Sequence, residues 1–225
     1  MTGPLALVGG HEFTEGCTFD AEIAATVGAT EVALLPTGWA YENPARAVDA
    51  ARTWFASLGL GVVEVPVYTR ADAMSAENVA AVRAAKMIYL TGVSPMHMRS
   101  VLLDTPVYAA VISAWEGGAA LVGSGGGTDV LCDPMIDIRG GAFTVGLGLL
   151  PDVAIMTHSD EKSRDMVQRT IKLASPSVLL VELPTRTALI DDEGDGRWRV
   201  AGAGDVVAHR QGTVVPFAEL PEARH

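Results

Sequence analysis

Ser124 and its glycine-rich surroundings are the residues of this chain best suited to nucleophilic chemistry. The serine lies in Gly-Ser-Gly-Gly-Gly, after an apolar run at 119–122 that is typical of a buried parallel strand. The residues from Thr128 onward can begin a helix. A strand that turns sharply into a helix around one serine is typical of a nucleophile elbow, in which strain falls on the serine backbone and glycines prevent clashes. The alternative is a flexible glycine turn without a chemical role.

His158 is the base that we expect to serve Ser124. A serine hydroxyl is a weak nucleophile at neutral pH and needs a histidine or a similar base within hydrogen-bond reach. His158 follows a predicted parallel strand at 153–157, so both residues would lie at the carboxyl-end edge of the sheet. His97 and His209 fit less well, because they fall on a predicted helix and in an antiparallel region. The alternative for His158 is a polar rim residue.

His11 and Glu12 are further candidates for a site. They follow the first predicted strand, at 5–8, and the pair Gly9-Gly10. In open α/β sheets, ligands bind at the carboxyl ends of the strands, which is where this loop would lie. A solvated loop pair is the alternative.

Strands and helices alternate along the chain in a way that would position these residues. The apolar patterns predict strands at 5–8, 31–35, 62–67, 87–90 and 119–122, with helices at 20–27, 44–58, 75–86, 96–103 and 105–116 between them. Asn43 is the expected cap of the second helix and Ser75 that of the third. Beyond the elbow they predict strands at 143–145 and 153–157, a helix at 162–174, and short strands at 178–181, 187–190, 198–200, 206–209 and 214–215. This order predicts an α/β fold, a three-layer sandwich with a mostly parallel central sheet and an antiparallel-rich C-terminal part, with residues 1–225 as a single domain.

Composition limits the partners and the compartment. The chain has 225 residues and a formal net charge of -11, which disfavours nucleic acid or an anionic membrane as a partner. No apolar run is long enough to span a membrane, and the N-terminus lacks the basic start of a signal peptide. Two cysteines form no disulfide framework, so we expect a cytoplasmic protein. No cysteine–histidine cluster predicts a metal, and no phosphate-binding glycine pattern predicts a cofactor.

Several motifs together resemble the dipeptidase E and cyanophycinase family of serine peptidases. The elbow and the Asp-Pro-Met-Ile at 133–136 look like that family's G-T-S-A-G-A elbow and its continuation. Gly-Leu-Gly-Leu-Leu-Pro at 146–151 is similar to the turn before the family's histidine strand, and Thr-Ala-Leu at 187–189 to a later strand. The likeness covers nearly the whole chain and implies a class I glutamine amidotransferase-like fold over residues 1–225.

The resemblance also implies a mechanism and a substrate class. Ser124 would attack an amide carbonyl while His158 takes and returns the proton. The N–H groups of Gly125 and Val93 would stabilise the oxyanion. The substrate would be a small peptide with an acidic or isoaspartyl residue at the scissile bond, and no cofactor or metal is implied. The loop after the fourth strand would contact oxyanion and substrate through Gly92, Val93 and Ser94.

The chain departs from the family at positions that concern the histidine and the substrate. Val93, Ser94 and Pro95 stand where the family has glycine, aspartate or asparagine, and glutamine, and Met156 replaces an aspartate. The acid just before the Thr-Ala-Leu strand is absent, because Thr185 and Arg186 stand there. Glu182, three residues before Thr185, is the acid that could take its place beside His158.

These departures leave two functional hypotheses from different classes. In the first, the chain is a serine hydrolase of small peptides or isopeptides. In the second, it is a catalytically impaired relative that uses the same pocket to bind a small ligand, or that acts as an oligomeric scaffold such as a homodimer.

Overall fold

The computed structural model describes residues 2–137 and 139–224. Its helices are α1 (Phe19–Val27), α2 (Pro44–Ser57), α3 (Ala76–Ala84), α4 (Pro95–Leu102), α5 (Pro106–Glu116), α6 (Gly126–Leu131) and α7 (Arg164–Leu173), with short 3-10 turns at Asp72–Met74, Ser159–Glu161 and Phe217–Glu219. Its strands are β1 (Leu5–Val8), β2 (Glu31–Gly38), β3 (Gly61–Glu64), β4 (Met87–Gly92), β5 (Ala120–Gly125), β6 (Cys132–Asp133), β7 (Met135–Ile136), β8 (Phe143–Thr144), β9 (Leu150–Pro151), β10 (Val153–Thr157), β11 (Leu179–Leu183), β12 (Thr187–Asp191), β13 (Trp198–Gly202), β14 (Val207–Arg210) and β15 (Thr213–Val215).

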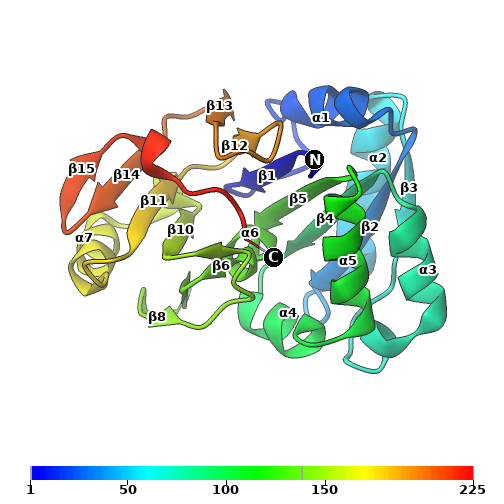
Figure 1. The fold of residues 1–225 in the computed structure, drawn as a ribbon, viewed down its shortest axis with the longest axis horizontal. Coiled ribbons are helices and arrows are strands. Elements are labelled where there is room, and N and C mark those ends of the chain that lie inside the picture. The colour runs from blue at the N-terminus through cyan, green and yellow to red at the C-terminus, as the bar shows by residue number, and fades with distance from the viewer. Residues whose placement is uncertain (1, 138, 225) are drawn as a thin grey trace.

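The main sheet has seven strands in the order β13-β12-β1-β5-β4-β2-β3. The strands β1, β5, β4, β2 and β3 run parallel to one another, while β12 and β13 add an antiparallel edge beside β1. Helices cover both faces of this sheet (Figure 1). The predicted three-layer α/β architecture with a mostly parallel central sheet is therefore confirmed.

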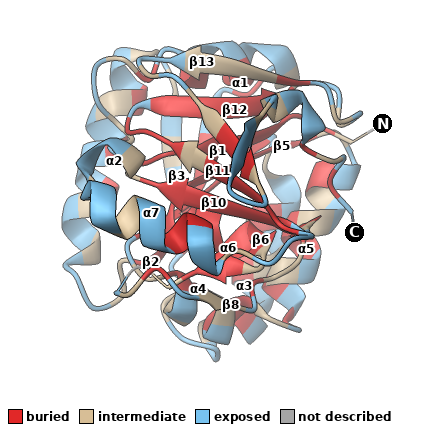
Figure 2. Ribbon diagram, turned by 90° about the vertical axis from the view of Figure 1, so that its left-hand side faces the viewer, coloured by how far each residue is buried: buried red, intermediate tan, exposed pale blue. Residues whose placement is uncertain are grey.

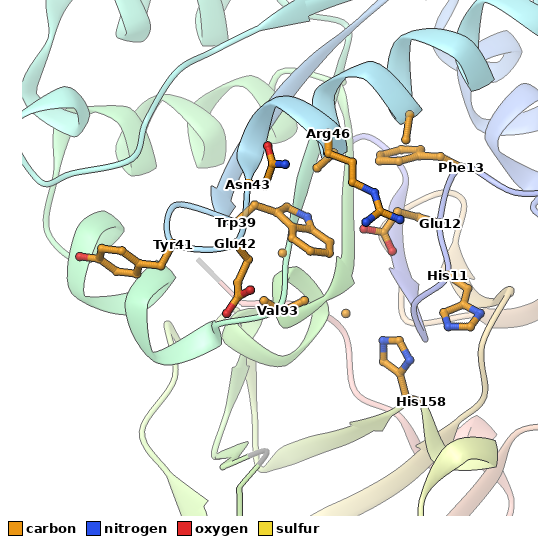
Figure 3. Close-up of a pocket in the computed structure, with 14 residues that line it drawn as sticks. His11, Glu12, Phe13, Trp39, Tyr41, Glu42, Asn43, Arg46, Val93 and His158 are labelled. Carbon is orange, nitrogen blue, oxygen red and sulfur yellow. The ribbon is translucent and has the colours of Figure 1, made fainter.

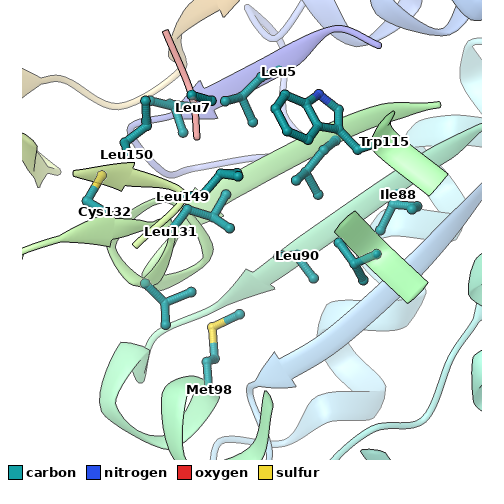
Figure 4. Close-up of a cluster of buried hydrophobic side chains, with 14 of the residues drawn as sticks. Leu5, Leu7, Ile88, Leu90, Met98, Trp115, Leu131, Cys132, Leu149 and Leu150 are labelled. Carbon is teal, nitrogen blue, oxygen red and sulfur yellow. The ribbon is translucent and has the colours of Figure 1, made fainter. Parts of the chain in front are cut away.

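Side-chain alternation along the strands explains why both faces of the main sheet are covered. In β4, Ile88 and Leu90 belong to the core that includes Trp115 of α5 (Figure 4). Met87 and Tyr89 belong to the opposite core, which α1 and α2 close. Successive side chains of a strand point to opposite faces, so an uninterrupted apolar run needs helices on both sides.

A second sheet of six strands, in the order β15-β14-β11-β10-β6-β9, lies beside the main one. Its β10 and β11 are parallel, whereas β14 and β15 pair antiparallel. The predicted antiparallel C-terminal part is thus divided: β12 and β13 extend the main sheet, and β11, β14 and β15 join β10. Both β10 and β12 are buried along their length, while α7 turns an exposed face to solvent (Figure 2).

The two helix caps that the sequence predicted have different outcomes. The Ser75 hydroxyl accepts from the Asn78 N–H at the start of α3, as predicted. Asn43, expected to cap α2, has φ 58 and makes no capping bond, and Pro44 begins the helix. No helix in residues 2–137 or 139–224 combines the length and apolar character needed to cross a membrane.

Candidate active site

The elbow is formed where β5 ends and α6 begins. Gly125 takes a conformation with positive φ at this turn, with φ 54 and ψ -119. The backbone strain that the sequence predicted at Ser124 therefore falls on the following glycine, which tolerates it without a steric penalty. A Cβ on Gly127 would lie 2.1 Å from the carbonyl oxygen of Leu90, so a glycine is required for α6 to pack against β4.

The Ser124 hydroxyl is held by a carboxylate of the loop between β1 and α1, residues 9–18, which we call the first loop. Ser124 has no exposed surface, and its Oγ donates to Oε2 of Glu12 at 2.8 Å. The hydroxyl of Thr91 donates to the other Glu12 oxygen and in turn accepts from Trp39 Nε1 at 3.2 Å. The loop that the sequence marked as a candidate site thus contacts the candidate nucleophile, through Glu12.

His158 begins the turn that follows β10, and both of its ring nitrogens have defined surroundings. Its Nδ1 is 2.9 Å from Oε2 of Glu161, and its backbone N–H donates to the Gly9 carbonyl at 2.7 Å. The surroundings of Nε2 follow from its distance to the two neighbouring glycines. A Cβ atom added to Gly10 would lie 2.1 Å from His158 Nε2, and a Cβ atom added to Gly125 would lie 3.7 Å from the same nitrogen. Nε2 therefore faces the first loop and the elbow. A proton on Nδ1, donated to Glu161, leaves the Nε2 lone pair free to accept.

Ser124 and His158 are positioned by strands of two different sheets. Ser124 ends β5 of the main sheet, whereas His158 follows β10 of the second sheet. The sequence predicted that both would stand at the edge of one sheet. The first loop joins the two edges instead, because Glu12 contacts Ser124 and Gly9 contacts His158.

The carboxylate beside His158 is Glu161, which is not among the site residues predicted from the sequence. The structure places Glu182 elsewhere: its Oε1 is 2.6 Å from His209 Nε2. Glu182 stands opposite Met156 in the β10–β11 pair. The available signal was the acidic turn Ser159-Asp160-Glu161, in which a residue three positions after the histidine can fold back onto it.

A pocket of about 610 Å³ opens in front of these groups (Figure 3). It is lined by the first loop, the end of β2 and the start of α2, the loop after β4, the elbow and the histidine: His11, Glu12, Phe13, Trp39, Tyr41, Glu42, Asn43, Arg46, Ala47, Ala50, Gly92, Val93, Gly125 and His158. Ser124 lies behind Gly125 and Glu12, with its side chain buried.

The predicted oxyanion and substrate residues differ in how they are placed. Gly92, Val93 and Gly125 line the pocket. The Val93 N–H, predicted as an oxyanion donor, points at the Gly38 carbonyl at 3.2 Å. Ser94 caps α4 instead, and its hydroxyl accepts from the His97 N–H at 3.4 Å.

A group of buried polar side chains lies near Glu12. Burial raises the pKa of Asp20 to about 7, although the Trp54 N–H, which donates to its Oδ2 at 2.8 Å, opposes the rise. Burial, reinforced by the charges of Asp20 and Glu12, holds the pKa of Tyr89 well above its usual value. Burial also raises the pKa of the Cys17 thiol to about 11, so this thiol stays protonated near neutral pH and is a poor nucleophile.

Arg46 supplies a positive charge to the pocket. It extends from α2 into the cavity (Figure 3). Within residues 2–137 and 139–224, no carboxylate forms an ion pair with its guanidinium. A guanidinium without a carboxylate partner in a pocket is suited to bind a carboxylate of a ligand.

Comparison with protein families and curated proteins gives consistent matches. Residues 5–197 match Peptidase family S51. The cyanophycinase of Synechococcus elongatus is 31% identical over 160 residues, which cover 65% of this chain and 49% of that protein. The cyanophycinase of Nostoc sp. is 28% identical over 177 residues, 74% of this chain and 57% of that protein. The chain therefore spans about half the length of the curated relatives that it matches.

Solved structures share the fold. A peptidase from an acI-B1 Actinobacterium superposes with a TM-score of 0.81 at 23% identity, over 96% of this chain and 98% of that one. A protein assigned as a peptidase E in Listeria monocytogenes gives a TM-score of 0.63 at 16% identity, over 93% and 99% of the two chains. At these identities the likeness establishes a common architecture.

Proposed function

This chain belongs to peptidase family S51, and from that membership we propose that it is a serine-type hydrolase of a small peptide or isopeptide. The observation that carries the proposal is the placement of His158. Its Nδ1 is bonded to a carboxylate, and its Nε2 faces the elbow that holds Ser124. A serine at an elbow and an imidazole that faces this elbow are the two groups that acyl transfer requires, although the Ser124 hydroxyl is bonded to Glu12 and not to His158 in the structure.

In the proposed reaction, Ser124 Oγ attacks the scissile carbonyl and His158 Nε2 removes its proton. The imidazole then gives that proton to the leaving amine, and water releases the acyl group by the reverse sequence. Glu161 keeps the proton on Nδ1 and stabilises the imidazolium that forms. The Gly125 N–H is the proposed oxyanion donor, and the Val93 N–H would have to exchange from the Gly38 carbonyl to join it.

Glu12 has a distinct part in this scheme. It accepts the Ser124 hydroxyl at 2.8 Å in the structure. In the proposed reaction the Ser124 side chain would have to change its staggered rotamer, so that the hydroxyl leaves Glu12 and bonds to the imidazole. We therefore assign Glu12 to holding the serine in the resting state, before substrate enters.

The proposed substrate carries a carboxylate near the scissile bond. Arg46 provides a guanidinium in the pocket, and a cavity of about 610 Å³ lies within the usual range for small-ligand sites. An acidic or isoaspartyl residue at the scissile bond is the substrate class that the resemblance to the dipeptidase E and cyanophycinase family implies, and the relatives are named cyanophycinases.

Hydrolysis of a dipeptide panel tests the proposal. Aspartyl, isoaspartyl, glutamyl and neutral dipeptides are incubated with the wild type, Ser124→Ala and the control Ser177→Ala, which removes an exposed hydroxyl. We expect release of amino acids from the acidic dipeptides by the wild type and the control, and loss of release in Ser124→Ala. Turnover that persists in Ser124→Ala would contradict the assignment of the nucleophile.

A comparison of two acids tests which carboxylate serves His158. Glu161→Gln should lower kcat by ~10²- to 10⁴-fold, because the amide cannot stabilise the imidazolium as a carboxylate does. Glu182→Gln should have a much smaller effect, since the Glu182 carboxylate contacts His209. A larger loss in Glu182→Gln than in Glu161→Gln would reverse the assignment.

The buried Ser124 favours a second candidate function, binding of a small ligand without turnover. The side chain has no exposed surface, and its hydroxyl is engaged by Glu12. In that case acidic dipeptides would bind, as measured by calorimetry, while no hydrolysis is detected in the wild type. Pairing as a homodimer belongs to the same alternative, and light scattering would detect it.

A further inference from the structure

Three side chains from two segments that are far apart in the sequence converge at one edge of the pocket. His11 comes from the first loop, whereas His158 and Glu161 come from the turn after β10. His11 Nε2 is 3.1 Å from Oε1 of Glu161, and His158 Nδ1 is 2.9 Å from Oε2 of the same carboxylate. The two imidazole rings are 5.4 Å apart and nearly perpendicular.

These groups have the chemistry of transition-metal ligands. Each residue offers one ligand atom, and the three atoms lie within 4.8 Å of one another. Two ligands of a tetrahedral Zn²⁺ lie about 3.4 Å apart, so a modest side-chain movement would close the set. His11 is exposed and His158 half-buried, which leaves room for that movement and for water as a fourth ligand.

We propose that His11, His158 and Glu161 bind a divalent transition-metal ion, with Zn²⁺ as the preferred ion. Two imidazoles and one carboxylate match the ligands that zinc takes in proteins, whereas Mg²⁺ and Ca²⁺ prefer sets made of oxygen. The net charge of -11 favours the approach of a cation. Sequence spacing gave no sign of the site, because the fold brings its ligands together from positions 11, 158 and 161.

The metal would switch off the base of the proposed hydrolase. Nδ1 of His158 faces Glu161, and Nε2 faces the elbow. An ion on Nδ1 takes the lone pair of that nitrogen, so the proton of the neutral ring moves to Nε2. A protonated Nε2 cannot accept the proton of Ser124. The inhibitory effect rests on the proposed function, but the binding of the ion does not.

Metal binding is tested on protein stripped with a chelator and dialysed. Zn²⁺ affinity is measured by competition with a chromophoric chelator, and Co²⁺ is used as a spectroscopic probe. The wild type should bind one Zn²⁺ per chain and give the visible absorption of a four- or five-coordinate Co²⁺ site. His11→Ala and Glu161→Gln should each weaken binding by about 10-fold or more.

The matched control is His97→Ala, which removes a histidine whose Nε2 is 2.9 Å from the Tyr68 carbonyl. This variant should bind Zn²⁺ as the wild type does. Circular dichroism of every variant checks that the fold is retained. Failure of the wild type to bind, or equal affinities for His11→Ala and the wild type, would overturn the site.

Inhibition is measured separately, on dipeptide hydrolysis by the wild type. Zn²⁺ should inhibit with a midpoint equal to the dissociation constant found by competition, and a chelator should restore activity. If Zn²⁺ saturates the site, as shown by the chelator competition, and hydrolysis is unchanged, the inhibitory effect is refuted but the metal site is not. If the protein hydrolyses no peptide at all, the proposed function fails, and the binding measurement still decides the metal site.

Discussion

Asp20 makes the stability of this fold depend on pH in a direction unusual for an aspartate. Its side chain is fully buried on α1, with Oδ2 accepting from Trp54 Nε1 and Oδ1 buried without a hydrogen-bond partner in the described structure. Burial raises its pKa from 3.8 to about 7. The substitution Asp20→Asn keeps the shape of this side chain and removes its titration.

The magnitude follows from this pKa. A rise of about 3 units corresponds to about 4 kcal/mol of linked free energy. Between pH 4 and pH 7 the native state binds more protons than the unfolded state, so stability falls as the pH rises through this window. Below pH 4 Asp20 is protonated in both states, and its full contribution to the free energy of unfolding is present. Above pH 7 this contribution is lost. About 3 kcal/mol should disappear between pH 5 and pH 8.

Urea denaturation at pH 5, 6, 7 and 8 measures this effect. The wild-type free energy of unfolding should fall relative to that of Asp20→Asn as the pH rises, by the amount given above. Trp54→Phe removes the donor to Oδ2, which lowers the pKa of Asp20 in the wild type. In this variant the pKa of Asp20 should therefore be higher, and the free energy of unfolding should go on falling to a higher pH than in the wild type. Parallel curves for the wild type and Asp20→Asn over this range would refute the reasoning.

Three other substitutions give separate predictions. Gly127→Ala places a Cβ 2.1 Å from a main-chain oxygen of β4 and should destabilise the protein by about 3 kcal/mol or more in thermal melts, whereas Gly140→Ala, which meets no atom within 4 Å, should not. The buried N–H of Val8 donates to the Thr128 hydroxyl at 2.9 Å, so Thr128→Val leaves this N–H without its acceptor. The free energy of unfolding, measured by urea titration, should fall by about 2 kcal/mol. An unchanged midpoint would show that this hydrogen bond does not stabilise the fold. Arg46→Gln should raise KM for acidic dipeptides by about 10- to 100-fold with a small change in kcat, and an equal effect on neutral dipeptides would exclude carboxylate recognition.

The main sheet could be predicted from the sequence because its strands are uninterrupted apolar runs between helices with clear start signals. Such runs need cover on both faces, which fixes the layers. The second sheet could not be predicted in the same way. Its strands β6 and β9 have two residues each, too few for a pattern, and which strands pair with β10 is decided by tertiary packing.

The candidate site was predictable in part for a similar reason. Ser124 and His158 were found because each follows an apolar strand, and the chain order matched a known family. The contact of Glu12 with Ser124 depends on the register of β1 against β5, which sets Val8 opposite Ser124 and brings the first loop beside the elbow. The position of Glu161 depends on a turn whose first residue, His158, has a left-handed φ of 51, and no local pattern indicates that for a histidine.

Covalent labelling with a fluorophosphonate probe, mapped by peptide mass spectrometry, tests whether Ser124 is an activated nucleophile. We expect one adduct on Ser124 in the wild type, slower labelling in His158→Ala, and no adduct in Ser124→Ala. A wild-type protein that folds, binds acidic dipeptides and yet takes up no probe at Ser124 would contradict this expectation.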